Sequence, residues 1–139
     1  MLFNFFKNVS EQALLEKEMR DDVEMELQLM AAVMVADGVL HGAEYDLVNA
    51  FFMAYVPNSE ERKDLEAFFT KSLDRYLVLK DNQESFLKDI EEIFSNVKPE
   101  NIQIFLDIME RLARSDKDYS PEERSLVSHL RIKYAHKMS

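Results

Sequence analysis

Four carboxylates recur at one spacing in two separate parts of the sequence. Asp37 is followed by Glu44 seven positions later, and Asp116 is followed by Glu123 at the same distance. If the two segments pack against each other, these side chains converge and offer the carboxylate oxygens that hard divalent cations such as Ca²⁺ and Mg²⁺ prefer. One hypothesis is therefore a cation site made of Asp37, Glu44, Asp116 and Glu123.

The same residues also suit helix capping, which needs no metal. Glu123 is the third residue of a helix expected to begin at Pro121, where a glutamate reaches back to the N–H group of the capping residue, Ser120. Glu44 has the corresponding position after Gly42. Asp37 and Asp116 can accept hydrogen bonds from amides of their own turns. Capping is the preferred interpretation, so no cofactor is predicted, and Ca²⁺ or Mg²⁺ remains the alternative ligand.

The sequence gives less support for other kinds of site in these turns. His41 lies between Asp37 and Glu44, but a lone turn histidine is a poor metal motif. The stretch that begins at Asp116 resembles an EF-hand calcium loop, yet Pro121 and Val127 replace its required glycine and glutamate. Two carboxylates can serve as acid and base, but no nucleophile or substrate cleft is indicated. We therefore predict no catalytic residues and no enzyme; the alternative is a metal-dependent enzyme or a Ca/Mg-binding sensor that uses these acidic turns.

Composition limits the class of protein. The chain has 139 residues, a formal net charge of −10, no cysteine, two glycines and three prolines. This charge repels phosphate backbones, so nucleic acid is not expected as a partner, whereas cations and basic proteins are. Without cysteine there is no thiolate catalysis or disulfide. No secretory leader and no apolar run long enough to span a membrane is apparent, so we expect a cytoplasmic protein.

The capping residues and the helical spacing of apolar residues predict an all-α protein. Leu, Met, Glu, Lys and Ala dominate, and they favour helix. The expected helices run from Ser10 to Asp37–Gly38, from near Gly42 to Pro57, after Asn58 or Ser59, after a capping box of Asp81 and Glu84, from Pro99, and from Ser120 with its own capping box. With a short segment at 2–7, this makes a single compact bundle of about six or seven helices, in one domain over 1–139.

Several segments suggest surfaces or core. The apolar N-terminal segment 1–9 contains three phenylalanines between residues 2 and 7, and we expect it to dock on the bundle; association with a membrane surface is disfavoured because Lys7 is the only base nearby. The mixed charge runs at 16–26 and 59–66 are typical of solvated helix faces. Four methionines, at positions 25, 30, 34 and 53, are assigned to core packing rather than to an adaptable binding surface.

The sequence contains an internal repeat. A shift of 79 residues places Asp37 on Asp116 and Glu44 on Glu123. The apolar positions that also coincide are Leu27 with Leu106, Met30 with Met109, Leu47 with Leu126, Val48 with Val127, and Tyr55 with Tyr134. Each copy, about 24–56 and 103–135, is predicted to be a helix, an Asp-containing turn and a second helix. The bundle should therefore contain two pseudo-symmetric hairpins.

These hairpins resemble the TerB-like domain family, which includes tellurite-resistance TerB proteins and the N-terminal domain of DjlA. The resemblance covers roughly residues 24 to 137 and is strongest where a helix ends in Ala36-Asp37-Gly38 and Glu44 follows. The second copy departs, because Lys117 follows Asp116. The resemblance implies an all-helical fold and an association with stress or metal-oxyanion (tellurite) resistance, without established enzymatic activity. The expected function is a small, acidic, non-enzymatic binding module for a protein partner, a divalent cation, or both.

Overall fold

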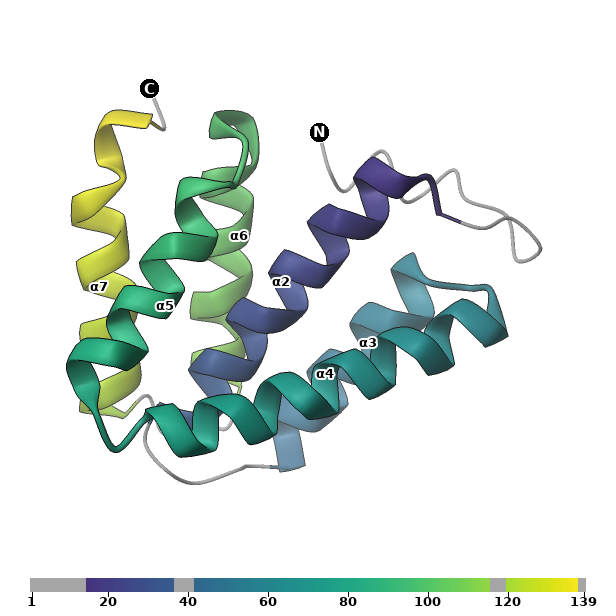
Figure 1. The fold of residues 1–139 in the computed structure, drawn as a ribbon, viewed down its shortest axis with the longest axis horizontal. Coiled ribbons are helices and arrows are strands. Elements are labelled where there is room, and N and C mark those ends of the chain that lie inside the picture. Colours follow the sequence, from purple (N-terminus) through teal and green to yellow (C-terminus); the bar gives the residue numbers. More distant parts are fainter. Residues whose placement is uncertain (1–14, 37–41, 116–119, 138–139) are drawn as a thin grey trace.

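The computed structural model describes residues 15–36, 42–115 and 120–137, and this part of the chain consists of helices joined by short connections (Figure 1). No strand occurs in these ranges, which confirms the predicted all-α class. The helices are α2 (Lys17–Val35), α3 (Gly42–Tyr55), α4 (Ser59–Leu79), α5 (Gln83–Ser95), α6 (Pro99–Ala113) and α7 (Pro121–Lys133), followed by a 3₁₀ turn, η1 (Ala135–Lys137).

Four of the predicted helix starts are confirmed, and one of them is the start of α3 at Gly42. The Asn58 side chain caps α4 by accepting a hydrogen bond from the Glu61 N–H at 3.0 Å. Pro99 is in the first turn of α6, where its missing N–H costs nothing. Ser120 and Glu123 form the predicted capping box of α7. These polar side chains satisfy N–H groups that have no partner within the helix.

One predicted start is wrong by a residue, and another lies outside the described residues. Asn82, rather than Asp81, caps α5, because the Asn82 side chain accepts from the Ser85 N–H at 3.1 Å. Both residue types cap helices well, so the path of the chain out of α4 decides which one is used. Ser10, the predicted cap of the first long helix, is not among the described residues, but Leu15 and Glu16 are not helical, so α2 begins at Lys17 and the predicted continuous helix from Ser10 is wrong.

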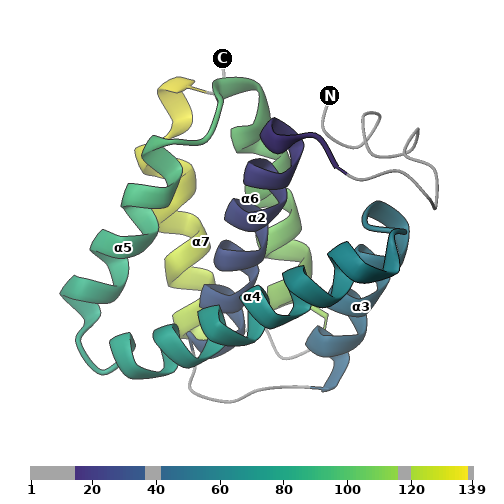
Figure 2. The same ribbon diagram turned by 45° about the vertical axis from the view of Figure 1, so that its right-hand side comes forward.

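Helix α2 is the centre of the bundle. It packs against α4 on one side and α6 on the other, with a smaller contact to α5 (Figures 1 and 2). Every residue from Leu29 to Val35 is buried, which covers all faces of the helix rather than one stripe. A helix that is apolar all round must be enclosed by neighbours, and here they come from both halves of the chain.

Aromatic side chains fill the space around α2. Phe105 and Phe94 are fully buried, and the Phe94 ring stacks on Tyr134 of the chain's last turn at 5.2 Å between centroids. Tyr76 packs edge-on against Phe86, with 5.7 Å between centroids. Such pairs contribute beyond the area that they bury, and they connect α4 to α5 and α5 to the end of α7.

Burial follows the predicted repeat. The pairs Leu27 and Leu106, Met30 and Met109, and Val48 and Val127 are all buried. Leu126 is 7% exposed, whereas its counterpart Leu47 is half-buried against the same core. An accidental match would allow one leucine to be buried and the other fully exposed, but neither is exposed. Superposition of the two hairpins remains a prediction.

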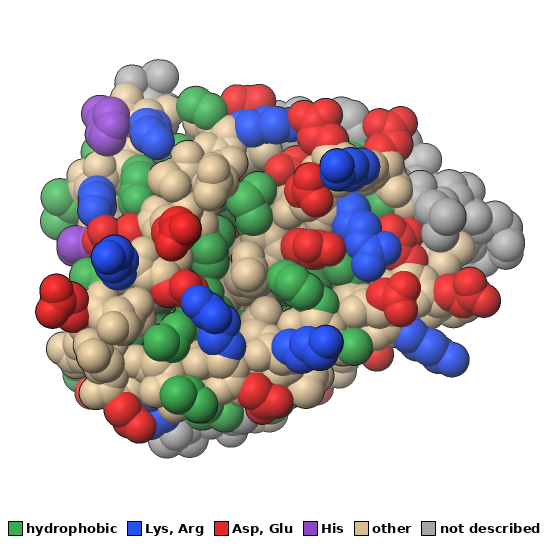
Figure 3. Space-filling view, viewed as in Figure 1, with side chains coloured by type: hydrophobic (Ala, Val, Ile, Leu, Met, Phe, Trp, Pro, Cys, Tyr) green, Lys and Arg blue, Asp and Glu red, His purple; other side chains and the backbone are tan. Residues whose placement is uncertain are grey.

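The surface carries mixed charge, but the two charge runs are not wholly solvated. Figure 3 shows acidic and basic side chains interspersed over one face of the molecule. Within the runs, however, Asp22, Glu26 and Glu61 are buried, because α2 is packed on both sides and the first turn of α4 lies against it. Met30 and Met34 lie in the core as expected, and Met53 does not: it is 71% exposed. No helix in the described ranges is long and apolar enough to cross a membrane.

Candidate functional site

Glu123 is held in place by the start of α7. Its backbone N–H donates to the Ser120 hydroxyl at 3.1 Å, and its Oε1 accepts from the Ser120 N–H at 3.4 Å. The side chain is 1% exposed, although it carries a carboxylate. The predicted capping role is therefore confirmed at Glu123, and the cap draws the carboxylate inward instead of leaving it in solvent.

Glu44 occupies the same place in the first hairpin. It is the third residue of α3, in the first turn, and it is completely buried. Because the N-terminal end of a helix carries partial positive charge, a carboxylate there is favoured. Both hairpins thus bury a carboxylate at the same point of their second helix. Whether Glu44 caps α3 as Glu123 caps α7 stays a prediction, because residues 37–41 lie outside the described ranges.

The aspartates of the hypothesis cannot be placed. Asp37 and His41 fall within 37–41, and Asp116 with Asp118 falls within 116–119, all outside the described residues. Their convergence with Glu44 and Glu123 remains a prediction. Among the residues that the structure does describe, no group of three or more His, Asp or Glu side chains is arranged to hold a metal ion.

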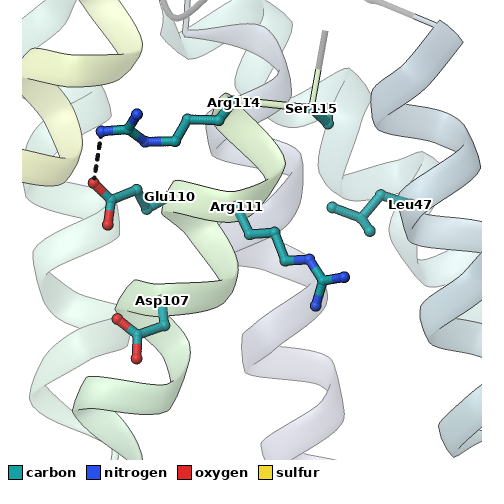
Figure 4. Close-up of a pocket in the computed structure, with 6 residues that line it drawn as sticks. All are labelled: Leu47, Asp107, Glu110, Arg111, Arg114 and Ser115. Carbon is teal, nitrogen blue, oxygen red and sulfur yellow. Dashed lines mark hydrogen bonds and ion pairs between the residues drawn. The ribbon is translucent and has the colours of Figure 1, made fainter. Parts of the chain in front are cut away.

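Two grooves indicate how the hairpins meet. One, of about 590 Å³, is lined by Ser115 at the end of α6 and Leu47 near the start of α3. Figure 4 shows Arg111 of α6 reaching toward the α3 side of this groove, while Arg114 turns to Glu110. The other groove, of about 360 Å³, is lined by Ala36 at the end of α2 and Leu126 near the start of α7.

These grooves are related by the repeat. Ala36 and Ser115 are equivalent positions, as are Leu47 and Leu126. In each groove the end of the first helix of one hairpin lies beside the start of the second helix of the other. The end of α2 therefore lies near α7, and the end of α6 lies near α3. Described residues next to each Asp-containing turn thus line a groove with the opposite hairpin.

Three further buried acids were not predicted, and they differ in how they are compensated. Glu61 accepts from the Leu15 N–H at 2.9 Å and from the Arg20 guanidinium at 3.5 Å. Burial raises the pKa of Asp22, and the nearby Asp21 and Glu100 carboxylates raise it further. Glu26 is the extreme case.

Both Glu26 side-chain oxygens are enclosed and have no hydrogen-bond partner among the described residues. Burial alone raises the pKa of this carboxyl well above its ordinary value of 4.5. Glu26 is the last residue of the polar run at 16–26, so its local sequence indicated a solvent-exposed side chain. The signal that could have revealed it is its counterpart in the repeat, the core residue Phe105.

His129 lies beside a carboxylate, Glu91, in the contact between α5 and α7. His129 Nε2 lies 2.9 Å from Glu91 Oε1, and the other Glu91 oxygen accepts from Lys133 at 2.5 Å. These two bonds lower the pKa of Glu91. The group connects α5 to α7 and contains no nucleophile. It therefore belongs to helix packing rather than to a reactive site.

Comparison with protein families assigns the class. The family model described as "Tellurite resistance protein TerB" matches residues 25–131, a range that covers most of both hairpins. The chain belongs to the TerB family, as its Asp-to-Glu spacing indicated. Searches of curated proteins and of solved structures yield no match.

Proposed function

We propose that this protein is a non-enzymatic binding module of the TerB family that acts in stress or metal-oxyanion (tellurite) resistance. It works by holding a divalent cation where its hairpins meet and by docking a protein partner, without catalysing a reaction. Family membership supports the association with tellurite resistance. The ligand is inferred from the two hairpins.

The cation site is inferred from the matched burial of Glu44 and Glu123 at the third position of α3 and α7. Burying a carboxylate is costly unless hydrogen bonds, a proton or a positive charge compensate it. A carboxylate has two oxygens and about four lone-pair sites, so one that caps a helix can also ligate a cation. The residues that would hold the ion are Glu44 and Glu123 with Asp37 and Asp116.

These residues fit a hard cation, because all four offer carboxylate oxygens and none offers sulfur. When bound, the ion supplies positive charge between the two hairpins. The ends of α2, α3, α6 and α7 support this assignment, since described residues next to each turn line a groove with residues of the opposite hairpin. Capping alone is the competing explanation, and it predicts a different response to metal.

Thermal melting with chelator and with excess Ca²⁺ or Mg²⁺ distinguishes a cation site from capping alone. For the cation, wild type should melt several degrees higher with metal, since a ligand at 100 times its Kd stabilises the folded state by about 2.7 kcal/mol. Glu44→Gln and Asp37→Asn should lose this gain and be more stable than wild type in chelator, because like charges repel in an empty site.

Glu60→Gln is the matched control, since Glu60 is a first-turn acid of α4 that faces solvent. It should respond to metal as wild type does. If wild type does not respond to either cation, and Glu44→Gln is destabilised equally in chelator and in metal, the acids are caps and the cation is excluded.

A further inference from the structure

A second surface lies between α3 and α4, away from the hairpin ends. These helices follow each other in the chain, but their main packing partners differ: α4 lies against α2 and α5, and α3 lies against α6. The groove of about 310 Å³ that remains between α3 and α4 is lined on one side by Tyr45, Val48, Asn49 and Phe52, and on the other by Glu66, Phe69, Thr70, Leu73, Asp74 and Leu77.

The groove has an apolar floor and a polar, acidic rim. Val48, Phe52, Phe69 and Leu73 are buried and form the floor. Glu66, Thr70 and Asp74 are exposed, and their spacing of four residues places them in one row along α4. The Glu66 and Asp74 carboxylates are eight residues apart, which is about 12 Å along a helix.

These two carboxylates are available to a partner. Among the residues that the structure describes, neither side chain forms an ion pair or a side-chain hydrogen bond, in contrast to Glu61 in the first turn of the same helix, which pairs with Arg20. A protein of net charge −10 attracts basic partners over long range, and its free rim carboxylates then provide local contacts.

Exposed apolar side chains continue this surface. Tyr45 is at the mouth of the groove and is 36% exposed. Met53 is one turn beyond Asn49 on α3 and is the more exposed of the two. Methionine adapts its shape to different partners and is over-used at surfaces that bind apolar helices. An exposed methionine one helical turn from Asn49, which lines the groove, is therefore suited to extend the docking surface.

We propose that the α3–α4 groove docks an amphipathic helix of a protein partner. The partner's apolar face lies over the floor of the groove against Tyr45 and the half-buried Leu77, which keep apolar surface exposed. Two basic residues of the partner, about eight positions apart, pair with Glu66 and Asp74. This names the class of protein partner within the binding role proposed above, but it uses none of the hairpin acids. A second copy of this chain does not suit the groove, because two molecules of charge −10 repel each other.

The test uses the full chain and a fluorescent synthetic peptide of about 18 residues, or five helical turns, with lysines eight positions apart beside a leucine face. Binding is followed by anisotropy, in chelator, and is mapped by amide NMR shifts. The comparison variant is Glu66→Lys/Asp74→Lys. Its control is Glu84→Lys/Glu92→Lys, two exposed acids of α5 with the same spacing and the same change in net charge.

We expect the groove variant to weaken peptide binding about tenfold or more and the α5 variant to weaken it only a few-fold, through long-range charge. Shifts should fall on α3 and α4, and a peptide with glutamate in place of the lysines should not bind. Equal losses in both variants, or shifts centred elsewhere, would overturn the proposal. So would concentration-dependent dimerisation through α3 and α4. The response of the groove variant to divalent cations should stay that of wild type, so failure here is separable from failure of the cation site.

Discussion

The two hairpins share a sequence pattern but not an environment. Helix α2 of the first is enclosed by α4, α5 and α6, so Ala31, Ala32 and Val35 are buried. At the equivalent positions α6 carries Glu110, Arg111 and Arg114, which reach toward solvent and the open groove (Figure 4). The copies have therefore diverged where the surroundings differ, while the acids at the helix starts, Glu44 and Glu123, have the same burial.

The sharpest contrast is between Phe105 and Glu26. Both are fully buried at one position of the repeat, yet one is an aromatic ring and the other a carboxyl without a hydrogen bond. The first hairpin thus tolerates a polar group where the second uses apolar packing. Stability measurements at these and neighbouring positions can break or sharpen this contrast.

The largest effect is expected at Phe105. Replacing it with alanine removes a fully buried ring and leaves a cavity, which should cost about 3–5 kcal/mol in the free energy of unfolding. Phe105→Leu should cost far less because it keeps most of the volume. Urea denaturation of both variants measures this. A loss below about 1 kcal/mol for Phe105→Ala would show that α6 does not share the core of α2.

Leu126 and Leu47 test the second helices of the hairpins. Leu126→Ala should cost about 2–3 kcal/mol, and Leu47→Ala about half of that, because Leu47 is only half-buried. The same denaturation experiment compares them directly. Equal losses would mean that the two second helices are anchored alike and that their difference in exposure has no energetic weight.

Glu26→Met should stabilise the protein, by about 1–3 kcal/mol at neutral pH, because it replaces an uncompensated polar group by an apolar one of similar size. The gain should depend on pH. Above pH 4.5 the unfolded chain ionises Glu26, whereas the folded chain, with a raised pKa, keeps the proton. The folded state then binds more protons, so wild-type stability falls as pH rises.

The advantage of Glu26→Met should therefore grow between pH 4.5 and pH 7, by at most about 1.4 kcal/mol per pH unit. Glu26→Gln is the control, since it removes the titration but retains a buried polar group. Thermal melts of the three proteins across this range measure the slope. A wild-type stability that rises relative to Glu26→Met over this range would contradict a carboxyl kept neutral by burial.

The smallest effect is expected at the α7 cap. Ser120→Ala removes the hydroxyl that accepts from the Glu123 N–H and should cost about 1 kcal/mol. Ser125→Ala, at an exposed position within α7, should change stability by no more than about 0.5 kcal/mol, because alanine favours helix. If the two variants behave alike, the capping box contributes nothing, and Glu123 is held by something else.

Local signals in the sequence predicted most of the fold. Asn58, Pro99 and Ser120 act within a few residues of themselves, so their roles could be inferred without knowledge of the neighbours. The cap of α5 was missed by one residue, because Asp81 and Asn82 are adjacent and the geometry of the preceding turn chooses between them.

Burial of individual charges could not be predicted in this way. Asp22, Glu26 and Glu61 sit in runs whose local spacing is that of a solvated helix, and only the packing of α4 and α6 on α2 encloses them. The prediction that Met53 lies in the core was wrong for the opposite reason. Its helical spacing suited burial, but the core does not extend over that face of α3. Of the candidate site, Glu44 and Glu123 could be placed at their helix starts, whereas their withdrawal from solvent depends on the neighbouring elements.

The exchange between the hairpins has an evolutionary consequence. Ala36 and Leu126 line one groove, and Ser115 and Leu47 line the other, so each juxtaposition is matched by its counterpart with the two copies interchanged. This is the pattern of an isologous interface, in which residue i of one subunit meets j of the other and the reverse. In such an interface a single hairpin pairs with a second copy of itself around a two-fold axis. In the present chain α4 and α5 join the two halves covalently, and one half, freed from self-complementarity, could take on a different surface from the other.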